Sequence, residues 1–600
     1  MFDKLNNLPK WTWDRLTPWL THRRLAVHLA LAAMVLSASA LLLGFYLDDY
    51  TGRYIYSDRE GAARLFENYS GGYGLAIGDP AENRWQMEAG WAPWWHYEQL
   101  RLALYRPIGV LVHSIDFRLW PDNATAMHAH NLLWLGLLVV AITWMYRGVM
   151  GGVIGGAAAL LFAFDHTHGF AVGHICNRHA LLGPLLGALC LGFHIRARRG
   201  EAQRGLVLAP LFYLVGLLTS ESAIAIAAYA VAYELFAANG SLRRRALAAA
   251  PYVVITMVWR ALYNKAGFGA FGSGVYIDLG RQPAEYLRTF LERGPVLWTG
   301  QFLTPPAELY GMLQDPVDRL LFLWSLSVLV FSLWTLAPLL RRDRMARFWF
   351  VGMLGSLVPA AAVLPHDRQL VFVSIGAMGL LAQLWHRYAT APRAYATLSL
   401  RLGMYYGMVL LFAHLVVSPL ALPATTASIA LTQPLHDAIA TVGDEAAGRD
   451  LIFVTTPDFY TVRLVQLTKR IAGAPLPKRI RALSGVPAGV PLPVLVTRTG
   501  ERTLELHFRD GLLSPPNSDL HRDRSLPMPA GTEVHLSGFD VEVLTATVEG
   551  WPVDVKFTFD KPLEDPSLVF YRWKDRGFSL FTPPALGESV ELPGASLPTI

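Results

Sequence analysis

The chain has 600 residues, of which 53% are hydrophobic and only 16% are charged, and its mean hydropathy is +0.32. In soluble domains about a quarter of the residues are charged, so this composition excludes an ordinary soluble protein and predicts a membrane protein. The net charge of +6 does not indicate nucleic-acid binding, because the basic residues lie in short loops between apolar runs. Cys176 and Cys190, the only cysteines, form no CxxC motif and no disulfide framework.

Apolar runs recur along the first two thirds of the chain. A helix needs about 20 apolar residues to cross a hydrocarbon core about 30 Å thick. The sequence therefore predicts an all-α membrane domain over residues 25–424 with about eleven transmembrane helices. The expected spans are 25–47, 131–147, 149–164, 179–195, 206–219, 222–237, 246–263, 319–340, 348–364, 370–386 and 402–422.

The basic residues orient these spans. Lys and Arg concentrate in every second short loop, whereas the alternate short loops hold only Arg178 and Arg368. Because Lys and Arg stay on the cytoplasmic side, this asymmetry predicts a cytoplasmic N-terminus and an exported C-terminus. Residues 1–24, with three tryptophans, are expected as a cytoplasmic interfacial segment. The preference for Arg over Lys hints at a GC-rich bacterial genome, and hence at a bacterial inner membrane with the C-terminal domain in the periplasm or outside the cell.

Three segments fall on the outer side of this topology. Residues 48–130 and 264–318 are expected as large outer loops, the first with tryptophans that we expect along the membrane interface. From residue 425 the composition changes to short alternating runs broken by Gly, Pro and Asp, with a helix expected at 458–471. The sequence thus predicts a soluble β-rich (α+β) domain over residues 425–600.

Ionisable residues gather at the outer ends of the predicted spans. Such groups are costly near the bilayer unless they face a polar cavity, so together they predict an outer cleft lined by acids and bases. The residues concerned are Asp48, Asp49, Asp165, His166, His168, His174, Arg178, Glu221, Arg260, Lys265, His366, Asp367 and Arg368.

Paired carboxylates beside cations suit glycosyl transfer. One carboxylate takes the proton of the acceptor hydroxyl, and cations or a metal stabilise the departing phosphate. Plainer interpretations remain open: Asp48 and Asp49 as the hydrated end of a helix, and Arg178 and Arg260 as side chains that reach lipid headgroups. Zinc binding by the histidines is disfavoured because no fourth ligand follows at zinc spacing.

Five motifs in fixed order resemble the GT-C superfamily of multi-pass glycosyltransferases, specifically its protein O-mannosyltransferase-like branch (family 39 and the transmembrane O-mannosyltransferases). The likeness covers most of residues 40–385. The motifs are the acidic pair in Phe45-Tyr-Leu-Asp-Asp-Tyr50; Tyr105-Arg106-Pro107 leading through Asp116 to His128, His130 and Asn131; Phe162-Ala-Phe-Asp-His-Thr-His168 through to Arg178; Leu218-Thr-Ser-Glu-Ser222; and Pro365-His-Asp-Arg368.

The chain also departs from this family. Phe170 and His174 occupy places where the family usually has Glu and Trp, and Ser220 stands where Lys is usual. No tetratricopeptide repeats follow the membrane domain. The departures point to a different sugar, a different acceptor or lost activity.

The resemblance implies an inverting transferase that moves a sugar from a polyprenyl-phosphate donor in the bilayer to a hydroxyl of a protein or glycan acceptor. We expect Asp49 or Asp48 as general base, Asp165 as a second acid and Glu221 as an orienting carboxylate. The expected donor-phosphate ligands are Arg178, Arg260, Lys265 and Arg368, and further cleft candidates are Arg106, His166, His168, His174 and His366. A divalent Mg²⁺ or Mn²⁺ on Asp48, Asp49 and Asp165 is compatible but not required, since Arg alone can hold a monophosphate.

Two other functions stay open at this point. A lipid-linked glycan transporter or flippase would need ionisable residues and broken helices near the middle of the bilayer, whereas these spans are mostly apolar at their centres. A non-catalytic scaffold derived from the GT-C fold is compatible with the motif departures.

Overall fold

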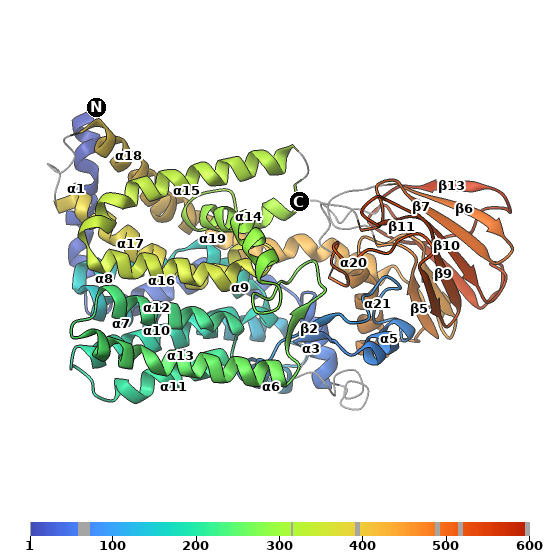
Figure 1. Ribbon diagram of the computed structural model, residues 1–600, viewed down its shortest axis with the longest axis horizontal. Helices are drawn as coiled ribbons and strands as arrows, with labels where there is room; N and C mark the ends of the chain where they lie inside the picture. The colour runs from blue at the N-terminus through green and yellow to red at the C-terminus, as the bar shows by residue number, and fades with distance from the viewer. Residues whose placement is uncertain are drawn as a thin grey trace.

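The computed structural model describes residues 2–57, 73–313, 316–390, 397–485, 493–513 and 520–594, with side chains from residue 10 onward apart from Pro434. A helical domain forms one end of the molecule and a β-rich domain forms the other (Figure 1). The predicted fold class, an apolar helical domain followed by a β-rich one, is confirmed.

Each predicted span coincides with a helix in the structure. Within the described ranges, six helical stretches are long and apolar enough to cross a membrane: Leu25–Leu42, Ala124–Met150, Ile175–Arg198, Leu242–Lys265, Val317–Arg342 and Leu398–Ala440. Two shorter helices, α8 (Gly152–Ala163) and α11 (Gly205–Leu217), are equally apolar. The other three are α12 (Ala225–Phe236), α16 (Arg344–Ala361) and α17 (Val371–Thr390). The count of about eleven spans therefore stays a prediction.

The N-terminal helix α1 (Phe2–Leu20) is part of the bundle. Trp13 is buried, with its ring 5.3 Å from that of Trp385 on α17. Trp11, in contrast, is largely exposed. The helix thus has one face on the protein and another that is free to contact the membrane interface.

The segment 264–318 is not a plain outer loop. It contains β3 (Gly269–Phe271) and α14 (Pro283–Phe302), whose second half is buried against α15 (Val317–Arg342) and α16. Charged residues in the first half of α14 lower its hydropathy, and its apolar run of Pro295 to Phe302 is too short to be read as a span.

The segment 48–130 is also ordered where it is described. It forms α3 (Asp48–Ser57), β1 (Gly74–Ile77), α5 (Pro80–Glu88), β2 (Arg101–Ala103) and α6 (Pro107–Leu119). Residues 58–72 lie outside the described ranges. Strands β1, β2 and β3 pair antiparallel, so the two segments expected as separate outer loops build one small sheet.

The β-rich domain has two sheets. Six antiparallel strands run in the order β13-β6-β7-β10-β9-β8 and four in the order β12-β11-β4-β5. Helix α21 (Phe459–Ile471) connects the parallel strands β4 and β5 and packs against α3. The strands are β4 (Asp450–Phe453), β5 (Arg479–Ala482), β6 (Val494–Gly500), β7 (Thr503–Phe508), β8 (Glu533–Leu536), β9 (Phe539–Ala546), β10 (Pro552–Phe559), β11 (Leu568–Lys574), β12 (Gly577–Leu580) and β13 (Ser589–Leu592).

Three tryptophans between α5 and β2 join the core of the β-rich domain. Trp91, Trp94 and Trp95 are buried there, and the Trp94 indole donates a hydrogen bond to the Leu483 carbonyl oxygen at 3.1 Å. The sequence suggested that these tryptophans lie along the membrane interface, but the structure buries them inside the protein. Burial of three indoles fastens the 48–130 segment to the C-terminal domain.

The predicted topology can be tested with reporter fusions. A reporter fused after residue 600 should be active only if it is exported, because the basic loops place the C-terminus outside. A fusion within the Arg-rich loop at residues 199–204 is the matched control and should be active only in the cytoplasm. A C-terminal fusion that is active in the cytoplasm would contradict both the predicted orientation and an outer cleft.

Candidate functional site

A cavity of about 630 Å³ lies where the helical and β-rich domains meet. Its walls come from α3, α6, α13 (Leu242–Lys265), α16, α17, the sheet β1-β2-β3 and α21. Six of the predicted site residues line it: Asp48, Arg106, His174, Glu221, Arg260 and Arg368. Seven do not: Asp49, Asp165, His166, His168, Arg178, Lys265 and His366.

The adjacent acids Asp48 and Asp49 have different surroundings. Asp49 is fully buried, and its two carboxylate oxygens accept backbone N–H bonds from Tyr46 at 2.8 Å and Cys176 at 2.9 Å. Asp48 faces the cavity and accepts a hydrogen bond from the Tyr460 hydroxyl at 2.5 Å. Asp49 thus ties α3 to the loop before α10 (His179–Arg198), while Asp48 is the acid that a substrate can reach.

Glu221 forms the centre of a polar group on another wall. Arg106 donates to it at 2.7 Å and the Tyr263 hydroxyl donates at 3.3 Å. The Arg106 guanidinium also lies 3.0 Å from His179 Nε2 and 5.1 Å from the centre of the Tyr73 ring. These contacts hold Glu221 and Arg106 as a fixed pair with part of each side chain open to the cavity.

Arg178 is held away from the cavity. It is fully buried, pairs with Asp116 at 2.5 Å, and donates to the Asn131 side-chain oxygen at 2.6 Å. Because its charge is already neutralised inside the protein, the structure does not bring Arg178 to a donor phosphate, contrary to the expectation from sequence. Lys265, at the exposed end of α13, also lies outside the cavity.

Arg260 and Arg368 both line the cavity, but only Arg260 has a carboxylate partner among the described residues. Arg260 contacts both carboxylate oxygens of Asp278 at 2.6 Å. Within the described ranges Arg368 has no carboxylate within 4.0 Å, and its guanidinium lies 5.4 Å from the centre of the Phe170 ring. Arg368 is therefore the better placed of the two to bind an incoming anion.

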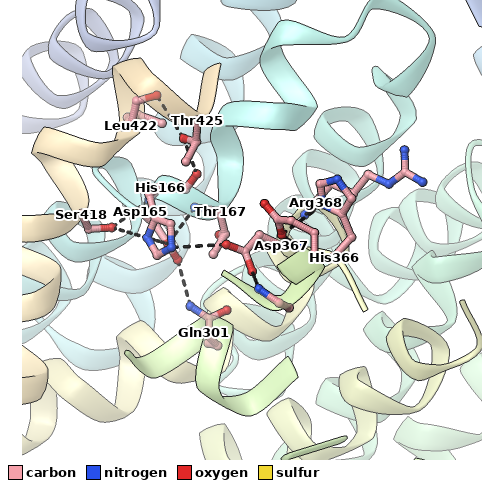
Figure 2. A network of polar contacts seen from close by, with 12 residues as sticks. Asp165, His166, Thr167, Gln301, His366, Asp367, Arg368, Ser418, Leu422 and Thr425 are labelled. Atoms are coloured by element: carbon pink, nitrogen blue, oxygen red, sulfur yellow. Dashed lines mark hydrogen bonds and ion pairs between the residues drawn. The ribbon is translucent and has the colours of Figure 1, made fainter. Parts of the chain in front are cut away.

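Asp165 belongs to a buried network rather than to the cavity (Figure 2). Its carboxylate accepts from Gln301 at 2.9 Å and from Ser374 at 2.6 Å. His166 lies 3.4 Å from Asp367, which in turn accepts from the Ala307 backbone N–H at 2.9 Å. The network joins α8, α14, α17 and α19 (Ser418–Ala427), which is a structural role for the residue that the sequence suggested as a second acid.

This network also places Arg368. Asp367 is fixed by His166 and Ala307, and Figure 2 shows the Arg368 guanidinium pointing away from the network. The His366 ring packs 4.5 Å from Phe170, and His168 is buried with Nε2 bonded to the Phe162 carbonyl oxygen. His166, His168 and His366 thus do not line the cavity but pack against the residues that hold its wall.

Of the four histidines expected at the site, His174 is the one that lines the cavity. It is 3% exposed, and neither ring nitrogen has a hydrogen-bond partner in the described part of the chain. Burial lowers the pKa of His174 to about 3, so its ring is neutral at ordinary pH.

The described residues include no group of three or more His, Cys, Asp or Glu side chains arranged to hold a metal ion. Asp49 and Asp165 are already saturated by N–H and O–H donors and do not face Asp48 across the cavity. The suggested Mg²⁺ or Mn²⁺ on Asp48, Asp49 and Asp165 therefore does not fit.

Several cavity residues were not found from sequence. They are Tyr73, His113, His179, Tyr263, Asp278, Tyr460 and Arg463. His113 and His179 lie in apolar helical runs, and Tyr460 and Arg463 lie in the β-rich domain, more than 400 residues after Asp48. No local pattern connects them, since tertiary contacts such as that of α21 with α3 bring the two domains together.

No protein-family model matches the chain, and no curated protein matches it. Among solved structures it is similar to the oligosaccharyltransferase of Archaeoglobus fulgidus tethered to an acceptor peptide, with 12% identity over 77% of this chain and 64% of that chain and a TM-score of 0.39. It is also similar to ArnT from Cupriavidus metallidurans bound to undecaprenyl phosphate, with 14% identity over 70% of this chain and 88% of that chain and a TM-score of 0.31. The chain spans less than two thirds of the length of the archaeal enzyme.

The buried Asp49 carboxyl should make the stability of the fold depend on pH. Burial raises the pKa of Asp49 from its ordinary 3.8 to about 7, because the charged form is poorly solvated. The protonated form is favoured by folding, so this contribution is complete below pH 4 and is lost as the pH rises through 7. Ionisation of the buried Asp49 carboxyl should therefore lower the free energy of unfolding at pH 8 by up to about 4 kcal/mol relative to its value below pH 4.

Thermal unfolding in detergent between pH 5 and pH 8 measures this effect. At pH 5 Asp49→Asn should unfold at a lower temperature than the unaltered protein, because one backbone N–H loses its acceptor, and this difference should shrink or reverse towards pH 8, because the variant has no carboxyl group to ionise and its pH profile is flatter. Asp48→Asn is the control and should keep the original slope. Parallel profiles for Asp49→Asn and the unaltered protein would contradict the assignment.

Proposed function

We propose that the protein is a membrane glycosyltransferase that moves a sugar from a polyprenyl-phosphate donor to an acceptor hydroxyl. One observation carries the proposal: a carboxylate, Asp48, and a guanidinium without a carboxylate partner among the described residues, Arg368, line the same cavity. An acid that can accept a proton and a cation that can bind phosphate are the two groups that this transfer needs.

The apolar part of the cavity suits the lipid donor. Its wall on the helical side includes Trp259 of α13, Val358 and Pro359 of α16 and Phe372 of α17. On α13, Met257 and Leu262 are largely exposed close to this wall, on a surface that would face lipid. An isoprenoid chain could therefore pass from the bilayer along α13 while its phosphate stays at the polar end of the cavity.

The reaction follows from these positions. The acceptor hydroxyl gives its proton to Asp48 while its oxygen forms a bond to the anomeric carbon of the sugar. The bond from that carbon to the phosphate oxygen breaks, and its electron pair leaves on the phosphate. Arg368 stabilises the added negative charge, and the Glu221–Arg106 pair orients the sugar through hydrogen bonds to its hydroxyls.

This assignment refines the roles expected from sequence. Asp48 rather than Asp49 is the base, and Arg368 rather than Arg178 is the phosphate ligand, with Arg260 and its partner Asp278 lining the same cavity. Transfer of a hexose, a mannosyltransferase-like specificity and a site on the outer face of a bacterial inner membrane belong to the same proposal.

Loss of the base should stop transfer without loss of donor binding. Asp48→Asn keeps the shape of the side chain but cannot take the proton, so transfer should fall by about a hundredfold to ten-thousandfold. Asp437→Asn, which alters an exposed acid outside the cavity, is the matched control and should transfer normally. Undiminished transfer by Asp48→Asn would remove the general base and favour a transporter or a scaffold.

Donor binding should depend on Arg368. Arg368→Ala should weaken binding of farnesyl phosphate, a short-chain polyprenyl phosphate, by about tenfold to a hundredfold, and Arg368→Lys should restore it only in part because Lys cannot bind phosphate in a bidentate way. Lys265→Ala removes a cation that lies outside the cavity, and this variant should bind farnesyl phosphate normally. Calorimetric titration in detergent measures the affinities, and equal binding by all variants would contradict the role of Arg368.

A further inference from the structure

Four arginines line the cavity: Arg106, Arg260, Arg368 and Arg463. Arg106 pairs with Glu221 and Arg260 with Asp278. Neither Arg368 nor Arg463 forms an ion pair with any described residue. The proposed function uses Arg368 for the donor phosphate, but it leaves Arg463 without a role.

Arg463 is unusual because it is buried and has no carboxylate partner among the described residues. The residue is 8% exposed, its Nε atom is fully buried, and in the described part of the chain its guanidinium donates no hydrogen bond. Its one contact with a π system is with the Trp91 ring, 5.8 Å from the ring centre. A cation–π contact offsets only part of the cost of removing a guanidinium from water, and no carboxylate among the described residues pairs with Arg463, so the position suits an anionic ligand.

An anion bound by Arg463 would lie on the same wall of the cavity as Asp48. Arg463 follows Tyr460 by three residues on α21, so both side chains lie on one face of the helix, with Cβ atoms about 5–6 Å apart. The Tyr460 hydroxyl is the group bonded to Asp48. The unpaired guanidinium and the proposed base therefore share one wall of the cavity, which the β-rich domain supplies together with α3.

This wall is on the acceptor side of the proposed reaction. The apolar wall with Trp259 and Phe372, and Arg368, come from the helical domain, where the lipid donor is proposed to enter, whereas α21 belongs to the domain outside the bundle. We propose that Arg463 binds an anionic group, a phosphate or a carboxylate, that the acceptor carries beside the hydroxyl from which Asp48 takes the proton. The inference rests on the proposed function and adds an acidic acceptor to it.

The test uses the full-length protein in nanodiscs and calorimetric titration with two small probes. Glycerol 3-phosphate carries a hydroxyl and a phosphate, and glycerol is the same molecule without the charge. The unaltered protein should bind glycerol 3-phosphate and not glycerol. Arg463→Ala and Arg463→Gln should weaken glycerol 3-phosphate by about tenfold or more, whereas farnesyl phosphate should bind as before.

Arg470→Ala is the matched control. Arg470 lies on the same helix with its guanidinium 5.7 Å from the Trp91 ring centre, yet it does not line the cavity. This variant removes a similar cation–π contact, so a loss of glycerol 3-phosphate binding equal to that in the Arg463 variants would mean that Trp91 packing is the cause, and it would overturn the inference.

Three further results would also overturn it: equal affinity of the unaltered protein for glycerol and glycerol 3-phosphate, unchanged binding by Arg463→Gln, or a loss confined to farnesyl phosphate, which would make Arg463 a donor ligand. The first of these needs no variant and is decisive even if the Arg463 variants do not fold. If the protein binds glycerol 3-phosphate through Arg463 but does not bind farnesyl phosphate, the proposed function fails while the anion site stands.

Discussion

Charged groups inside an apolar helical domain must be neutralised by partners, because little water is available to solvate them. Most of the site depends on this constraint. Arg178 with Asp116, and Asp165 and His166 with Gln301, Ser374 and Asp367, are satisfied within the protein and join helices that are distant in sequence. Against this background a charge that faces the cavity without a partner indicates where a ligand belongs.

The buried pairs shape the cavity although they do not face it. Asp49 bonds the backbone before α3 to the loop before α10, which leaves the adjacent Asp48 on the cavity wall. Asp367 likewise is held by two elements, and the next residue is Arg368. In both places a buried acid fixes the backbone while its neighbour in sequence faces the cavity, so the two roles are divided between consecutive residues.

The β-rich domain is part of the site rather than an appendage. Trp91, Trp94 and Trp95 anchor the 48–130 segment in its core, and α21 packs on α3 with Tyr460 bonded to Asp48. Since the cavity walls come from both domains, any motion of the β-rich domain relative to the bundle would change the position of Tyr460 and Arg463 relative to Asp48. This coupling gives the C-terminal domain a direct influence on the shape of the cavity.

The sequence by itself determined the membrane class, the position of the apolar helices, the β-rich tail and the gathering of ionisable residues at the ends of these helices, because hydropathy and alternation are local properties. It could not separate Asp48 from Asp49, or Arg178 from Arg368, because each pair has the same local signature. Only the tertiary structure decided which member is buried against a partner and which faces the cavity. That outcome depends on contacts such as Arg178 with Asp116 and Tyr460 with Asp48, whose partners lie tens to hundreds of residues apart and leave no periodic pattern.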